Sequence, residues 1–148
     1  MALLKSSRSA QWPLVQEFVL NFDDTMVDIG GTTRGAALAL LSNADLRAFP
    51  MPPGAVLIGG EIVVETAFVG PTAATISVGD TNSATRYASA VDLKTAARTA
   101  LTLTGYRNAA GDDILIRLNT TVAVASAGKV TVRVMYTVAG RSCEVQVA

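Results

Sequence analysis

The clearest hydrophobic pattern lies in the last third of the chain. Within residues 129–138, apolar residues occupy every second position and mostly polar residues lie between them, and residues 113–120 repeat this arrangement. Strict alternation in β-branched residues predicts strands with one buried face. Turn-forming residues 125–128 separate the two segments, which predicts an antiparallel hairpin. The residues expected to face inward are Ile114, Ile116, Leu118, Val130, Val132, Val134, Tyr136 and Val138.

Shorter alternating segments occur elsewhere in the chain. Residues 17–22, 62–68, 75–78 and 144–147 each predict a strand, and these segments are separated by turn-forming residues such as those at 79–83 and 139–141. The apolar segment 35–41 fits a strand or a short helix, and the turn residues that bound it favour the strand. Residues 49–54 contain three prolines and a glycine, which predicts a rigid connection rather than a central strand.

One segment has helical character. Residues 87–100 are rich in alanine and contain neither glycine nor proline, as a helix interior prefers. This predicts one or two helical turns near Ala90–Ala97, in a crossover between strands. Short strands at regular spacing predict an all-β sandwich or barrel, and the absence of alternating strand and helix patterns argues against a parallel sheet.

The composition of the chain narrows the classes of protein that fit. Its 148 residues are 50% hydrophobic, 16% charged and formally neutral, which suits one domain with a packed core. A neutral surface offers little attraction for nucleic acid or an anionic membrane and favours association with other protein surfaces. No apolar run is long enough for a membrane-spanning helix. The single cysteine fits synthesis and folding in a reducing cytoplasm.

The usual catalytic and metal-binding groups are scarce. Histidine is absent, so the common hydrolase triads lack their general base. There is one cysteine, which is too few for a thiolate zinc site. The pairs Asp23-Asp24 and Asp112-Asp113 would point to opposite faces of a strand, and turns explain them better than catalysis. Residues 80–83 carry oxygen ligands without the spacing of a calcium loop. We therefore expect no enzyme activity, no cofactor and no metal.

The N-terminal residues suggest a contact with another protein. Residues 1–12 lack the apolar region of a secretory signal and are expected to form an arm that precedes a single domain at 13–148. Trp12 is the sole tryptophan, and it fits equally a plug in the core or an anchor on a neighbouring subunit. The charge is also uneven, with more acidic side chains in the first half of the chain and more basic ones in the second. This fits complementary faces for self-association or, more simply, solvated surface charge.

The middle of the chain carries a family resemblance. Its order of motifs is Gly54–Glu61, Thr66–Phe68, Ala74–Asp80, Arg86-Tyr87, Val91–Lys94, Arg98–Leu101 and Thr104–Tyr106, followed by alternating segments up to about residue 140. This order resembles the head decoration, or cement, proteins of tailed bacteriophages. The resemblance covers residues 54–140.

The resemblance implies a jelly-roll-like antiparallel β-sandwich with an extended N-terminal arm and one short crossover helix. It implies a homotrimer that binds the major capsid protein on the exterior of the virion, is assembled in the host cytoplasm, and needs neither catalysis nor a cofactor. The alternative is a tail- or fibre-associated β-sandwich module that binds a host-surface glycan. Candidate capsid or subunit contacts are Lys5, Arg8, Trp12, Arg86, Tyr87, Tyr106 and Arg107.

Overall fold

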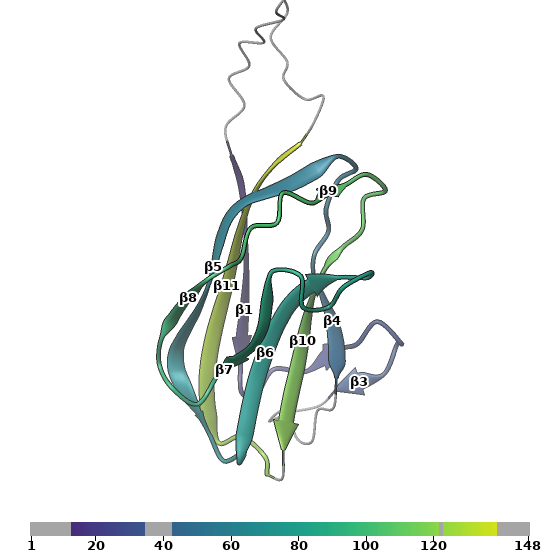
Figure 1. The fold of residues 1–148 in the computed structure, drawn as a ribbon. Helices are drawn as coiled ribbons and strands as arrows, with labels where there is room; N and C mark the ends of the chain where they lie inside the picture. Colours follow the sequence, from purple (N-terminus) through teal and green to yellow (C-terminus); the bar gives the residue numbers. More distant parts are fainter. Residues whose placement is uncertain (1–12, 35–42, 122, 139–148) are drawn as a thin grey trace, which may run out of the picture.

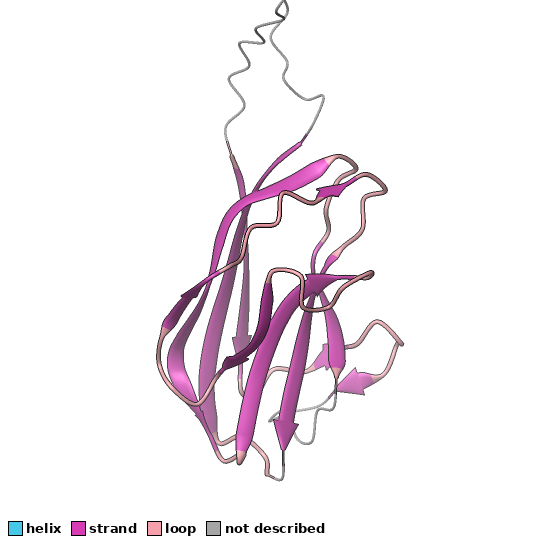
Figure 2. Cartoon of the chain, in the orientation of Figure 1, coloured by secondary structure: helices cyan, strands magenta, loops and turns pink. Residues whose placement is uncertain are grey.

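The computed structural model describes residues 13–34, 43–121 and 123–138, and every regular element within them is a strand (Figures 1 and 2). The strands are β1 (Leu14–Asn21), β2 (Met26–Val27), β3 (Thr33–Arg34), β4 (Ala44–Phe49), β5 (Ala55–Val69), β6 (Ala73–Asp80), β7 (Ala88–Asp92), β8 (Arg98–Ala100), β9 (Arg107–Asn108), β10 (Ile114–Thr121) and β11 (Ala127–Val138). The all-β class predicted from the sequence is therefore confirmed. None of the described segments forms a helix long and apolar enough to cross a membrane.

Two curled antiparallel sheets make up most of the fold (Figure 1). The first sheet has the strand order β1-β11-β5-β8, and β9 pairs with one end of β5. The second sheet has the order β4-β10-β6-β7, and β2 and β3 form a small separate pair. Strands that are distant in sequence are thus neighbours in both sheets, as β1 and β11 illustrate.

The core lies between the two sheets, and the predicted inward faces supply it. Ile114, Ile116 and Leu118 on β10 are 0–2% exposed. On β11, Val132 is fully buried and pairs with Phe18 on one side and Ile62 on the other. All eight residues expected to face inward on these two strands are buried. The period-two alternation therefore identified the buried faces correctly.

The predicted pairing of these two strands is wrong. β10 lies between β4 and β6 in the second sheet, whereas β11 lies between β1 and β5 in the first. The residues between them, 123–126 in the described part, connect the two sheets instead of forming a hairpin turn. Ser126 donates its backbone N–H to the carbonyl oxygen of Val69 at 2.8 Å, so this connection is held by the end of β5.

The predicted helix near Ala90–Ala97 is also wrong. Residues 88–92 form β7, which pairs with β6. Ala90 has a φ of 48°, in the left-handed region that a right-handed helix excludes. Leu93 is fully buried, and its N–H and C=O bond to Ala74 and Phe68 in neighbouring strands. These bonds to the sheets override the weak helical preference of alanine.

The remaining predictions divide into three groups. The strands at 17–22 and 62–68 lie within β1 and β5 apart from Phe22, and the proline-rich connection at 49–54 joins β4 to β5 as expected. The strand at 75–78 is longer than predicted, because β6 continues to Asp80. The segments at 1–12, 35–41 and 139–147 lie outside the described residues. The assignment of 13–148 to one domain stays a prediction.

Candidate interaction surfaces

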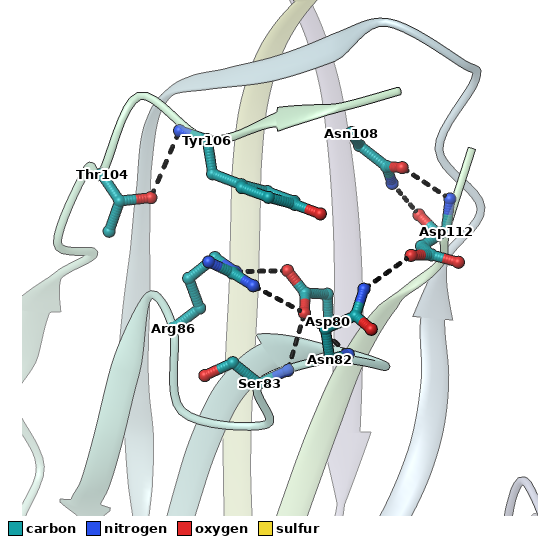
Figure 3. A network of polar contacts seen from close by, with 8 residues as sticks. All are labelled: Asp80, Asn82, Ser83, Arg86, Thr104, Tyr106, Asn108 and Asp112. Atoms are coloured by element: carbon teal, nitrogen blue, oxygen red, sulfur yellow. Dashed lines mark hydrogen bonds and ion pairs between the residues drawn. The ribbon is translucent and has the colours of Figure 1, made fainter. Parts of the chain in front are cut away.

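The structure brings together two of the residues singled out in the sequence. Arg86 and Tyr106 meet at one end of the second sheet, where the turn after β6 lies under the segment that leads to β9 (Figure 3). Arg107 lies beside them in β9 and is exposed. Lys5, Arg8 and Trp12 lie outside the described residues. The side chain of Tyr87 lies in the core instead of on the surface.

A buried carboxylate organises this end of the molecule. Asp80 is the last residue of β6 and is 2% exposed. Its Oδ1 accepts the backbone N–H groups of Asn82 at 3.0 Å and Ser83 at 2.8 Å. Its Oδ2 accepts the Nε–H of Arg86 at 2.5 Å. The carboxylate therefore closes the turn and neutralises the guanidinium, and it raises the pKa of Arg86 through that hydrogen bond.

The guanidinium of Arg86 also stacks on an aromatic ring. Its central carbon lies 3.8 Å from the centre of the Tyr106 ring (Figure 3). A cation above the face of a tyrosine is attracted by the negative face of the ring. This contact fixes the segment before β9 against the turn after β6. Tyr106 stays partly exposed, so Arg86 and Tyr106 together present an ordered basic and aromatic surface.

Amide side chains extend the same network toward β10. Asn82 donates its Nδ2–H to Oδ2 of Asp112 at 3.2 Å. Asn108, which is 7% exposed, accepts the N–H groups of Gly111 and Asp112 at its Oδ1 and donates its Nδ2–H to the carbonyl oxygen of Asp112. Two loops that are separated in sequence are thereby tied to one another. We call the residues Asp80, Asn82, Ser83, Arg86, Tyr106, Asn108 and Asp112 the end network (Figure 3).

Gly79 permits the close turn at the end of β6. A Cβ at this position would overlap the backbone of Ser83 and Ala84, and backbone atoms cannot move aside as a flexible side chain can. The sequence pattern predicts a loop at Gly79. The structure shows that it belongs to the strand and lets the following turn fold back onto it.

Tyr87 contributes to the core beneath the end network. It is 3% exposed, and burial raises the pKa of its phenol to about 12. Its backbone N–H donates to the carbonyl oxygen of Val78, and its own carbonyl oxygen accepts the N–H of Thr102 at 2.7 Å. Tyr87 thus anchors in the core the segment that carries Arg86, the residue before it.

A second polar surface covers the outer face of the first sheet, and no motif in the sequence predicts it. Arg133 on β11 binds Glu17 on β1 at 2.5 Å and Glu61 on β5 at 3.1 Å. Glu61 also binds Arg98 on β8. The four side chains form an alternating row of charges across four strands. The row follows from the strand register, which pairs Arg133 with both glutamates, and the sequence alone does not give that register.

Apolar side chains flank this row of charges. Val15 is 59% exposed and pairs with Met135, whose side chain packs over Gly59 so closely that a Cβ there would lie 2.6 Å from it. A shallow pocket of about 190 Å³ is lined by Val15, Gly60, Glu61, Arg98, Arg133 and Met135. Hydrogen bonds from Arg133 and Arg98 lower the pKa of Glu61, so its carboxylate stays ionised. The face therefore presents a charged stripe beside an apolar one, a pattern suited to contact with protein.

In the described ranges, no three acidic or cysteine side chains gather in a way that could hold a metal ion. Asp80 has oxygen atoms suited to a calcium loop, but both accept hydrogen bonds within the protein, from the backbone of the turn and from Arg86. Internal hydrogen bonds and ion pairs thus hold both the end network and the outer face of the first sheet in ordered positions.

The fold thus defines an all-β chain of two curled antiparallel sheets that enclose one core. No protein-family model matches the sequence, and no curated protein matches it. Among solved structures, one similar chain comes from the capsid asymmetric unit of cyanophage Pam1. It has 22% sequence identity and a TM-score of 0.53, with 92% of this chain and 91% of that chain covered.

A second similar chain comes from the acid-stable capsid structure of Helicobacter pylori bacteriophage KHP30. It has 13% sequence identity and a TM-score of 0.56, with 85% of this chain and 87% of that chain covered. Both alignments span most of each chain, so the likeness extends to the whole fold. At these identities the likeness is one of fold.

Proposed function

We propose that the protein is a structural component of a tailed-bacteriophage capsid, and specifically a decoration protein that binds the outside of the shell and stabilises it. The observation that carries the proposal is the likeness over nearly the whole chain to proteins from two phage capsids. The motifs in residues 54–140, which resemble those of phage head decoration proteins, support the same role. In this role the protein has no catalytic function.

The order of the strands supports a jelly-roll sandwich as the finer description of the fold. The eight principal strands are β1, β4, β5, β6, β7, β8, β10 and β11. Counted in chain order, the first sheet contains the first, eighth, third and sixth of these strands, and the second contains the second, seventh, fourth and fifth. Two interleaved Greek keys give this order, as in jelly-roll domains of viral capsids.

The two ordered surfaces suit a protein that holds other proteins together. The end network fixes Arg86 and Tyr106, and ion pairs between strands hold the side chains on the outer face of the first sheet. Preorganised groups lose little conformational freedom on docking. We propose that the partner is the major capsid protein, that the protein acts on the capsid exterior as a homotrimer, and that several weak contacts add up through avidity.

Sedimentation with capsid shells tests the proposal. Purified protein is mixed with shells of the major capsid protein encoded by the same phage, and bound protein is measured in the pellet. We expect saturable binding and shells that resist heat better when the protein is bound. Free protein that stays in the supernatant at all concentrations, with shells of unchanged stability, would contradict the proposed function.

A pair of charge reversals tests the contribution of the end network. Arg107→Glu should weaken binding to shells because it reverses an exposed charge next to Tyr106. Arg47→Glu is the matched control, since Arg47 is 71% exposed on β4 and makes only a long ion pair of 3.4 Å with Asp113. If the two variants bind shells equally well, the end network is not part of the docking surface.

The trimer is tested by the mass in solution. Three chains of 15.3 kDa would give about 46 kDa by size-exclusion chromatography with light scattering. A mass of one chain at all concentrations would contradict a trimer that forms before docking.

A further inference from the structure

The first sheet ends in a strand whose outward edge is open. β1 is the first strand in the order β1-β11-β5-β8, so among the described strands β11 is its only neighbour in the sheet. Its eight residues pair with β11 without a register shift, from Leu14 with Tyr136 to Asn21 with Lys129. A long and regular edge strand presents unpaired backbone groups to any extended chain that approaches.

The hydrogen bonds identify which backbone groups face outward. Phe22 donates its N–H to the carbonyl oxygen of Gly128 on β11 at 3.0 Å. In an antiparallel pair alternate residues bond to the same neighbour, so Leu20, Phe18 and Gln16 also face β11. Asn21 faces the other way, since its N–H bonds to the carboxylate of Asp24 at 2.7 Å.

The residues of opposite phase therefore form the open edge. These are Val15, Glu17 and Val19, each with one N–H and one C=O directed away from β11. In the described part of the chain these groups have no hydrogen-bond partner. The side chains of Val15 and Val19 are 59% and 40% exposed, and that of Glu17 is 47% exposed.

The other outer strands do not offer an equivalent edge. Asp45 on β4 already accepts the N–H of Ile29 at 2.9 Å on its outward side. β7 has five residues and is interrupted by the left-handed Ala90, and β8 has three residues. β1 alone among these four strands combines length, regularity and free backbone groups.

The charge beside β1 defines what the edge would accept. Glu17 lies on β1, Asp23 and Asp24 follow in the turn after it, and residues 13–33 contain no lysine or arginine. Asp28, further along, is already paired with Arg34 at 2.8 Å. Glu17 shares its single ion-pair partner, Arg133, with Glu61. A second copy of β1 in antiparallel pairing centred on Glu17 would set Glu17 opposite Glu17, which is unfavourable. A basic chain would instead be attracted to Glu17 and to the acidic turn that follows β1.

We propose that β1 is a docking edge for an extended basic segment of the capsid shell protein, which adds to the first sheet as a strand; the identity of that protein rests on the proposed function. Strand addition would satisfy the N–H and C=O groups of Val15, Glu17 and Val19. The matching segment carries a lysine or arginine opposite Glu17. It carries apolar, β-branched residues two positions away on each side, opposite the two valines.

A proline substitution tests the edge without breaking the sheet. Val19→Pro removes an N–H that points outward, and proline is tolerated in edge strands at such positions. Val19→Thr is the matched control because it keeps the N–H and the branched side chain. We expect Val19→Pro to remain folded and to lose shell affinity by about tenfold or more, while Val19→Thr binds nearly as the wild type does.

A second variant and a direct measurement keep the test independent of proline. Glu17→Lys should weaken shell binding because it opposes a basic segment, with folding checked by circular dichroism. Amide hydrogen exchange should show fast exchange at Val15, Glu17 and Val19 in the free protein and slow exchange at Phe18 and Leu20. Binding to shells should then protect the three fast amides. Equal shell binding by both Val19 variants and Glu17→Lys would overturn the proposal.

The edge can also be probed without shells. The capped peptide Val-Thr-Lys-Thr-Val, at millimolar concentration, should shift the NMR amide signals of the open-edge residues, and Val-Thr-Glu-Thr-Val should not. If the wild-type protein fails to bind shells, the proposed function fails, and the lysine peptide alone decides whether the edge exists. No shift would overturn the edge. A change in solution mass with Val19→Pro would show instead that a second copy occupies it.

Discussion

Replacement of Asp80 by alanine tests whether one buried carboxylate holds the end network together. Asp80 is 2% exposed and accepts the backbone N–H groups of Asn82 and Ser83 and the guanidinium of Arg86. A hydrogen bond to a charged group contributes about 1.5–3 kcal/mol. Water can reach the exposed Asn82, so we take the lower limit for each of the two backbone bonds. Asp80→Ala should then lower the free energy of unfolding by about 3 kcal/mol.

Two further variants separate the causes of that loss. Asp80→Asn keeps an oxygen for the two backbone N–H groups and loses the charge, so it should cost about 1 kcal/mol. Asp112→Ala is the matched control, because its carboxylate accepts only the exposed side chain of Asn82 at 3.2 Å. It should cost about 0.5 kcal/mol or less.

Urea unfolding followed by circular dichroism measures these differences. With a slope of about 2 kcal/mol per molar urea, Asp80→Ala should lower the midpoint by about 1.5 M. Its slope should match that of the wild type, since the unfolded states expose similar surface. A midpoint within about 0.3 M of the wild type, or an equal loss for Asp112→Ala, would refute the argument that the buried carboxylate closes this end.

The remaining predictions concern the core, the acidic groups, the buried phenol and the N-terminal residues. Val132→Asp should abolish folding because Val132 is fully buried, and a soluble variant with native circular dichroism would contradict the strand facing. The pKa of Glu61 and that of Glu65 lie below the ordinary 4.5 because of hydrogen bonds from Arg133 and Lys129, so their contribution to stability is present above that value. It is lost as the pH falls through the lowered values, and a melting temperature that stays constant from pH 6 to below pH 4 would count against it. Tyr87 should titrate near pH 12, apart from an ordinary phenol, in ultraviolet absorbance of the folded protein. Deletion of residues 2–12 should leave folding intact and weaken shell binding, and full retention on shells would exclude a role for those residues in docking.

The sequence predicted β1, β5, β6, β10 and β11, and the buried faces of β10 and β11, because alternation depends only on local order. It did not predict β4, β7, β8 or β9, whose segments do not alternate so clearly. It did not predict which strands are neighbours. β10 and β11 have the same one-sided pattern whether they pair with each other or with strands of different sheets, since both arrangements bury the same side chains. The partners are set by distant residues, such as Phe18 and Ile62 for Val132. Pairing is therefore a property of the whole chain.

The candidate site was predicted in fragments for the same reason. Arg86 and Tyr106 were singled out by residue type, yet they are twenty positions apart and meet only because the segment before β9 folds over the turn after β6. Asp80 was interpreted as a turn residue, and its burial could not be inferred from the turn alone. The alternating charges of Glu17, Arg133 and Glu61 likewise become a row only when the three strands are in register.

The open edge of β1 shows how local and long-range information combine. Local sequence gives an alternating strand that carries Glu17 and is followed by Asp23 and Asp24. The topology then places that strand at the border of a sheet, and the bond from Phe22 to Gly128 decides which of its backbone groups face outward. An edge of this length in a β protein invites pairing with any extended chain unless charge restricts the choice. Here the acidic residues act as that restriction, because Glu17 disfavours a second copy centred on itself, and Glu17 with the turn after β1 favours a basic segment.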